Sequence, residues 1–172
     1  MSQYLDFASH AVVQKEIEYY TQRFILRPRQ LIDLSLPVVL NWQRIRFVKK
    51  HSSSVVEAPG IYAFVIQHDG PGLPPHGYVA YIGQTGAARQ KRTLRDRFND
   101  YFSEKKRPKR KHIWELLNKW DKCLFFHFAP VDVKRADLAK IEQQLNDAMM
   151  PPYSRFDFSA DIRKRKRIWE VS

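Results

Sequence analysis

The chain has 172 residues, 44% of them hydrophobic, and this length and composition suit one domain with a sizeable core. Its 30 Lys and Arg residues against 18 Asp and Glu residues leave a formal net charge of +12, which favours polyanions as partners. It contains no run of the roughly 18 apolar residues that a membrane-spanning helix needs, and residues 1–30 carry charges in place of the apolar core of a signal peptide. Cys123 is the single cysteine, which excludes an internal disulfide. We therefore expect a cytoplasmic protein without a membrane partner.

Residues 1–56 are interpreted as an N-terminal extension with a helix and an irregular segment. Apolar side chains recur at helical spacing over residues 8–24, so an amphipathic helix is expected there. Arg27-Pro28 is expected to end it, because the residue before a proline disfavours the helical conformation. Residues 44–48 alternate like a strand, but no role is assigned to this extension.

Residues 57–158 are interpreted as the main domain, of the α+β class. Two segments rich in β-branched and aromatic residues flank a loop with three Gly and three Pro in ten residues, which predicts a β-hairpin. In chain order, the expected elements are strands over residues 60–67 and 78–82, helices over residues 94–102 and around Trp114 and Leu117, a strand over residues 124–128 and a helix over residues 138–149. This order predicts a small three-stranded antiparallel sheet flanked by helices, and residues 159–172 are interpreted as a basic C-terminal tail.

The positive charge is clustered in two places. Residues 89–111 contain eleven basic and three acidic side chains, and residues 163–167 are all Lys or Arg. Such runs typically contact the phosphate backbone of a nucleic acid, which positions a substrate without reading its sequence. The clustering therefore predicts a nucleic-acid partner and makes Lys109, Arg110 and Lys111 candidate substrate-binding residues.

Short motifs of tyrosine, arginine, glutamate and proline follow one another along the main domain. In chain order they are Gly60-Ile61-Tyr62, Tyr81-Ile82-Gly83, Arg97 with Tyr101, Ile141-Glu142 and Pro151-Pro152-Tyr153. The two tyrosine motifs lie on neighbouring strands of the expected hairpin, and nineteen residues lead from one tyrosine to the other. In this order, the motifs resemble those of the GIY-YIG nuclease superfamily, which includes excision-repair, homing and restriction enzymes. The resemblance covers roughly residues 57–158.

The resemblance implies a Mg²⁺-dependent endonuclease that hydrolyses phosphodiester bonds, with DNA as the expected substrate and Mn²⁺ as an alternative ion. It implies Glu142 as the single metal ligand, which suits Mg²⁺ because this ion prefers oxygen ligands and keeps several waters. It also implies that Arg97 places positive charge on the scissile phosphate, since a guanidinium group stays protonated and matches phosphate oxygens. Tyr101 lies one helical turn after Arg97 on the same face, so the pair is expected to converge on one ligand.

A tyrosine of the two motifs is implied as the general base, and both Tyr62 and Tyr81 remain candidates. Antiparallel pairing in the hairpin is expected to bring their side chains together. The ordinary pKa of tyrosine is about 10, so the phenolate is scarce at neutral pH. We expect the charges of Mg²⁺ and of nearby arginine side chains to lower this pKa in the site.

The region before the arginine helix supplies further candidates for contacts with the substrate. Residues 86–93 are an insertion rich in Arg and Lys by comparison with the family, and Lys91 and Arg92 lie within it. Either of them can supply positive charge to a phosphate. Arg92 and Arg95 also remain alternatives to Arg97 in the catalytic role.

Two positions depart from the pattern of the family. Gln84 stands where the excision-repair members have a lysine, so it can donate a hydrogen bond but adds no charge. Ser154 stands twelve residues after Glu142, where many members have an asparagine that supports the site. These departures motivate an alternative function, a catalytically weak or inactive nucleic-acid-binding module with the same fold.

Overall fold

The structure, a computed structural model of the chain, describes residues 12, 15, 18–19, 21–74, 76–86, 92–107, 109–132, 137–155 and 158–164. Three sequence predictions fall outside these residues in whole or in large part. They are the helix expected over residues 8–24, the candidate Lys91, and the basic run 163–167.

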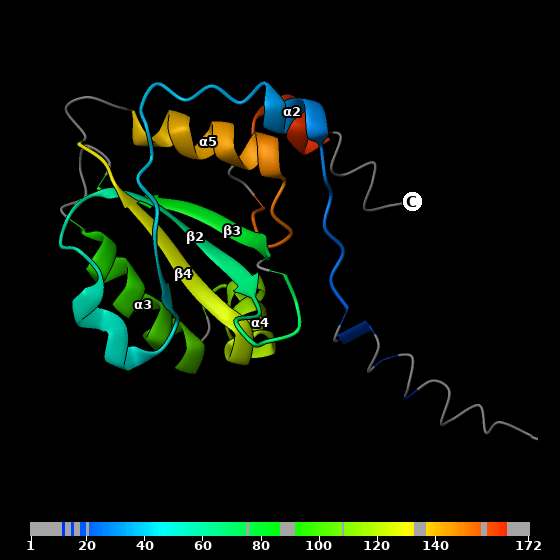
Figure 1. Cartoon of the computed structure of the whole chain (residues 1–172), viewed down its shortest axis with the longest axis vertical. Coiled ribbons are helices and arrows are strands. Elements are labelled where there is room, and N and C mark those ends of the chain that lie inside the picture. The colour runs from blue at the N-terminus through cyan, green and yellow to red at the C-terminus, as the bar shows by residue number, and fades with distance from the viewer. Residues whose placement is uncertain are drawn as a thin grey trace, which may run out of the picture.

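Four antiparallel strands form one sheet in the order β1-β4-β2-β3 (Figure 1). They are β1 (Gln43–Arg46), β2 (Gly60–Gln67), β3 (Gly77–Thr85) and β4 (Leu124–Pro130). The predicted α+β class and the β2–β3 hairpin are confirmed, but the predicted number of three strands is wrong. The additional strand is β1, which lies within residues 1–56 and pairs with β4. Its sequence gives a weak signal, because Ile45 is its only partly buried residue.

Helices α3 (Leu94–Lys106), α4 (Lys111–Lys119) and α5 (Leu138–Met149) stand where the apolar periodicity predicts helices. The described residues also contain a short helix, α2 (Pro28–Ile32), and two 3-10 helices, η1 (Lys49–Ser54) and η2 (Asp121–Cys123). Pro28 was expected to end the helix over residues 8–24; residues 21–27 before it are not helical, and Pro28 itself begins α2. The first turn of a helix tolerates proline because the N–H group that proline lacks would have no helical partner there.

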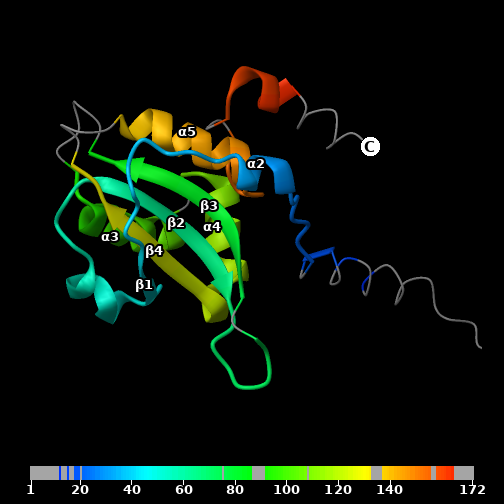
Figure 2. The ribbon, with the colours of Figure 1, turned by 45° about the horizontal axis from the view of Figure 1, so that its top comes forward.

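The sheet separates two layers of helices, with α3 and α4 against one face and α5 against the other (Figures 1 and 2). Alternate residues of β2 enter different cores, as the period of two in a strand requires. Tyr62 and Phe64 join the larger core under α3 and α4, whereas Ile61, Ala63 and Val65 join the smaller core under α5. Among the described residues, no helix is long and apolar enough to cross a membrane.

A capping box fixes the start of α3, the helix that carries Arg97 and Tyr101. The Thr93 hydroxyl accepts a hydrogen bond from the Asp96 backbone N–H at 3.1 Å, and the Asp96 carboxylate accepts one from the Thr93 backbone N–H at 2.9 Å. The hydrogen bonds that the Asp96 carboxylate accepts from the Thr93 backbone N–H and from the Thr93 hydroxyl group hold the pKa of Asp96 below its ordinary value. The box satisfies N–H groups that have no partner within the helix.

Replacement of Thr93 by alanine is expected to lower the free energy of unfolding by about 1 kcal/mol, because the helix loses its cap. Urea denaturation followed by circular dichroism would measure this loss as a lower midpoint. Thr93→Ser is the matched control, since serine can make the same hydrogen bond and should stay close to the wild type. Equal losses in both variants would contradict a capping role for the hydroxyl.

Candidate functional site

Tyr62 lies on β2 and faces α3 and α4. Its side chain is fully buried, with 0% exposure, among the aromatic residues of the larger core. Gly83 stands opposite it on β3, and a Cβ atom at this glycine would lie 2.4 Å from the Tyr62 hydroxyl oxygen. The glycine of the second tyrosine motif therefore leaves the space that the Tyr62 hydroxyl group fills.

Tyr81 lies beside Tyr62 on the same face of the sheet. It pairs with Phe64, and its ring centroid is 6.3 Å from that of Tyr62. A register shift on β3 leaves Ala80 without a partner on β2, and such a bulge changes the direction of nearby side chains. The expectation that antiparallel pairing brings the two tyrosines together is confirmed.

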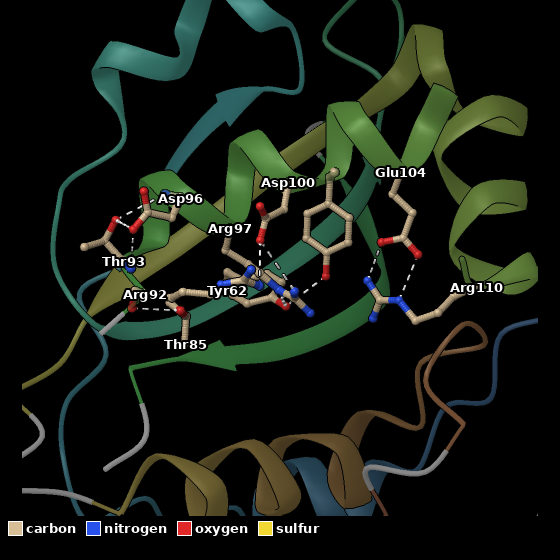
Figure 3. A network of polar contacts seen from close by, with 10 residues as sticks. Tyr62, Thr85, Arg92, Thr93, Asp96, Arg97, Asp100, Glu104 and Arg110 are labelled. Atoms are coloured by element: carbon tan, nitrogen blue, oxygen red, sulfur yellow. Dashed lines mark hydrogen bonds and ion pairs between the residues drawn. The ribbon is translucent and has the colours of Figure 1, made fainter. Parts of the chain in front are cut away.

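Arg97 reaches the Tyr62 hydroxyl group from α3 (Figure 3), and Tyr101 of the same helix also contacts this group. Arg97 Nε donates a hydrogen bond to Tyr62 Oη at 3.0 Å, and the hydroxyl oxygens of Tyr62 and Tyr101 lie 2.8 Å apart. The Arg97 guanidinium carbon is 5.2 Å from the centre of the Tyr101 ring, within the range of a cation–π interaction. We call Tyr62, Tyr81, Arg97 and Tyr101 the tyrosine–arginine cluster.

The electrostatics of the cluster correct one expectation. Burial raises the pKa of Tyr62 well above its ordinary value, Tyr101 and Tyr81 raise it further, and Arg97 lowers it only in part. The tyrosine pKa was expected to fall; for Tyr62 the charge of Arg97 acts in that direction, but burial outweighs it, and the expected effect of Mg²⁺ stays a prediction. Burial alone would lower the pKa of Arg97, but the tyrosine oxygens raise it, and the guanidinium group stays protonated.

A groove with a volume of about 690 Å³ lies beside the cluster, between α3 and the start of α4. Five basic residues line it, and we call it the basic groove: Arg92, Arg97, Arg107, Lys109 and Arg110. Of the candidates in the 109–111 run, Lys111 is not part of this lining, and its ammonium group lies 3.9 Å from Glu115.

Two acidic residues of α3 hold arginine side chains at the groove (Figure 3). Asp100 lies 2.9 Å from Arg92 and 3.9 Å from Arg97, measured between carboxylate oxygen and guanidinium nitrogen. Glu104 accepts two hydrogen bonds from Arg110, at 2.9 and 2.7 Å, in the bidentate geometry that fixes a guanidinium plane. Sequence reasoning missed both acids, although their spacing of three residues from Arg97 and Tyr101 is a helical signal.

Arg95 is engaged elsewhere. Its Nε donates to the Val55 carbonyl at 2.7 Å, one Nη donates to the Ser53 carbonyl at 3.2 Å, and the other pairs with Glu57. These bonds attach the first turn of α3 to the end of η1. Arg95 was an alternative to Arg97, but its described contacts are those of a structural residue.

Glu142 lies on α5, the helix that covers the opposite face of the sheet from Tyr62. It is half-buried, next to Ile141 of the smaller core. Gln84 pairs with Ile61 and shares the α5 face, and its Oε1 is buried without a hydrogen-bond partner among the described residues. The proposed metal ligand and the glutamine thus share the α5 face, while Tyr62 faces α3 and α4.

Ser154 supports the edge of the sheet. It is fully buried, and its hydroxyl oxygen accepts a hydrogen bond from the Ile82 backbone N–H at 3.4 Å. The neighbouring Tyr153 N–H donates to the Ala80 carbonyl at 3.0 Å. The serine therefore contributes support to the second tyrosine motif, which is the kind of role expected of the asparagine that it replaces.

The described part of the chain holds no group of three or more His, Cys, Asp or Glu side chains that could bind a metal ion. A preformed, all-protein metal site is therefore not found in these residues. A single carboxylate that shares an ion with a substrate phosphate and waters remains compatible with the preference of Mg²⁺.

Comparisons of the chain with protein-family models, with curated proteins and with solved structures give no match. The features of this chain that bear on function are therefore the motifs and the geometry of the cluster and the groove.

Proposed function

We propose that this protein is a Mg²⁺-dependent endonuclease of the GIY-YIG type, with DNA as the expected substrate. The observation that carries the proposal is the contact of Arg97 with the Tyr62 hydroxyl group. Thirty-five positions separate these residues, and the fold joins the first tyrosine motif to the arginine helix beside a groove with five basic residues. Partial burial of the Arg97 charge costs free energy unless it is compensated, and Tyr62 and Asp100 compensate it here.

Arg97 would stabilise charge on the phosphoryl group. Its Nε is fixed by Tyr62, while the side chain keeps 23% exposure and lines the basic groove. A guanidinium group held in place before the substrate arrives needs little reorganisation during the reaction, which is the main source of electrostatic catalysis. Arg92, Arg107 and Lys109 would bind neighbouring phosphates along the groove.

Glu142 would hold the metal ion, because one carboxylate with a phosphate and waters can satisfy Mg²⁺. When bound, the ion supplies positive charge that stabilises the leaving oxygen. Gln84, on the same face of the sheet, has a buried amide oxygen without a described partner. This oxygen is a further neutral acceptor on the α5 face of the sheet.

Tyr62 would act as a positioning residue, and Tyr81 would act as the general base. A base must lie within hydrogen-bond reach of the proton that it removes. Tyr62 is fully buried, its hydroxyl group is bound to Arg97 and Tyr101, and its pKa is raised. Tyr81, with 5% exposure, lies on β3, the edge strand of the sheet.

One observation favours a second function, a nucleic-acid-binding module without efficient turnover. The raised pKa of Tyr62 makes the Tyr62 phenolate scarce at neutral pH. A module of this kind would bind phosphates through the basic groove and would not cut them. Both functions predict binding that weakens as salt rises, with a slope of roughly 0.9 per neutralised phosphate on duplex DNA. Cleavage therefore has to separate them.

The decisive experiment is a digestion panel of labelled single-stranded, duplex and branched DNA and of RNA, with Mg²⁺ or Mn²⁺. We expect the wild type to cut at least one DNA substrate. Glu142→Gln should cut about tenfold to a hundredfold more slowly at low Mg²⁺ and should recover in part as the Mg²⁺ concentration rises, by analogy with other weakened metal sites. Glu115→Gln, the same change on α4, should match the wild type.

A wild type that stays inert on every substrate with both ions would refute the nuclease and favour the binding module. If Glu142→Gln cuts as fast as the wild type at all Mg²⁺ concentrations, the metal ligand is a different residue.

A further inference from the structure

A cavity of about 550 Å³ lies on the α5 face of the sheet, away from the tyrosine–arginine cluster. Ala63 and Val65 of β2, Val79 and Ile82 of β3 and His127 of β4 are among the residues that form its floor. Because β2 residues alternate between faces, Ala63 faces this cavity while Tyr62 faces the cluster. We call this cavity the α5-face pocket.

Small residues create the hollow. Ala63 fills little of the space in front of the sheet, and Gly77 of β3 has no side chain. Leu145 and Met149 of α5 form one wall, and Trp42, just before β1, lines the pocket as well. The volume and the apolar lining match pockets that hold small molecules, which range over about 300–1,000 Å³.

The polar groups of the pocket select a neutral ligand. Among the lining residues there is no Asp, Glu, Lys or Arg. His127 Nε2 is buried and has no hydrogen-bond partner in the part of the chain that the structure describes. Burial lowers the pKa of His127, and Arg44 lowers it further against an opposing effect of Asp69, so the ring is neutral at neutral pH. A neutral imidazole nitrogen can donate or accept one hydrogen bond, according to its tautomer.

Two more residues complete the pattern. The Gln67 amide nitrogen donates to Asp69 Oδ1 at 2.9 Å, so its carbonyl oxygen is the group that can accept a bond from a ligand. Trp42 keeps 42% exposure although it lines the pocket, and an exposed indole face is a stacking surface for a flat ring. The pocket thus offers apolar walls, one aromatic plane and a few hydrogen-bonding groups.

We propose that the α5-face pocket binds a single unstacked nucleobase, which stacks on Trp42 and forms hydrogen bonds with His127 and Gln67. A nucleobase is flat, neutral and carries donors and acceptors on its edge, as this lining requires. The lack of basic residues in the lining disfavours a phosphate inside the pocket. The source of the base rests on the proposed function, since a nucleic-acid substrate would supply it.

The pocket and the cluster lie on opposite faces of the sheet. Ala63 and Ile82 line the pocket, whereas their neighbours Tyr62 and Tyr81 face α3 and α4. A base in the pocket would therefore not contact the tyrosine–arginine cluster. Its binding can be measured without cleavage.

The test is a titration of the full chain with adenosine and thymidine, which carry no phosphate, followed by saturation-transfer NMR and by the Trp42 indole N–H signal. We expect at least one nucleoside to bind with a dissociation constant on the order of 1 mM, as its small size allows. Trp42→Ala and Val79→Phe should each weaken binding about tenfold or more, the first by loss of stacking and the second by filling the pocket. His127→Phe should weaken it while the apolar wall remains.

Trp114→Ala is the matched control, because Trp114 on α4 is 39% exposed and outside the pocket. It should leave the dissociation constant unchanged. Absence of nucleoside binding to the wild type, equal binding by all variants, or binding of toluene with no nucleoside bound would each overturn the inference. A wild type that cleaves but binds no nucleoside overturns the pocket alone. A wild type that binds nucleosides but cleaves nothing supports the pocket and refutes the nuclease.

Discussion

Replacement of Arg97 by alanine is expected to lower DNA cleavage on the order of a hundredfold or more. The residue is held by a hydrogen bond to Tyr62 Oη and lines the basic groove, so it would contribute a fixed positive charge to the phosphoryl group. Loss of one preorganised donor in other enzymes has an effect of this size. Single-turnover cleavage of the best DNA substrate, at saturating Mg²⁺, measures it directly.

Arg97→Lys should recover little of this activity. Lysine keeps the charge but has no Nε donor for Tyr62, and its single ammonium group does not reproduce the fork of a guanidinium group. Arg29→Ala, on the exposed part of α2, removes the same charge outside the site and should cleave like the wild type. A fully active Arg97→Ala variant that remains folded by circular dichroism would exclude Arg97 from the chemistry. Full activity in Arg97→Lys would mean that only the positive charge of Arg97 matters, and not its guanidinium geometry.

The elements of the fold that could be predicted are those in which the pattern of apolar side chains reflects burial. β2 is buried throughout and α5 shows a helical stripe, so composition and periodicity identify both. β1 was missed as a strand of the sheet because it joins the sheet through main-chain hydrogen bonds to β4. Ile45 is its only partly buried residue, so its side chains give little sign of burial in the sequence. The short helix α2 was not expected from the sequence; it begins at Pro28 because proline disfavours the middle of a helix but suits its first turn.

The residues of the site could be predicted from the sequence better than the contacts between them. Arg97 and Tyr101 are four residues apart on a helix, so they were expected to share a face. The hairpin likewise predicted the pairing of the two strands that carry Tyr62 and Tyr81. That Arg97 binds Tyr62 depends on how α3 packs across the sheet, which no local pattern records. The raised pKa of Tyr62 depends on complete burial, a property of the whole core. The α5-face pocket was missed for the same reason, because a hollow has no sequence signal.

The second large effect is expected at the tyrosines, which we assign different roles. Tyr81→Phe should lower cleavage by about a hundredfold or more, the range for loss of a general base. Tyr62→Phe should have a smaller effect, on the order of tenfold, because it removes the hydrogen bond that positions Arg97. Tyr78→Phe, at an exposed tyrosine of β3, is the control and should match the wild type.

The dependence of cleavage on pH distinguishes the base from the positioning residue. If a phenolate removes the proton, the rate should rise about tenfold per pH unit below the pKa of that tyrosine. We expect this rise in the wild type and in Tyr62→Phe between pH 6 and about 9, and a flat profile in Tyr81→Phe. A flat profile in Tyr62→Phe, with the rise kept in Tyr81→Phe, would exchange the two roles.

Folding stability gives an independent measure of the state of Tyr62. Its pKa in the folded protein is raised above the unfolded value of about 10, so its contribution to stability is complete below pH 10. That contribution is lost as pH rises from 10 through the folded pKa, by up to about 1.4 kcal/mol per unit. In urea titrations from pH 8 to 11, the wild type should therefore lose more stability above pH 10 than Tyr62→Phe, whereas Tyr78→Phe should follow the wild type. Equal losses in all three proteins would mean that the Tyr62 hydroxyl ionises in the folded state as easily as in the unfolded chain, and Tyr62 would then be available as a base.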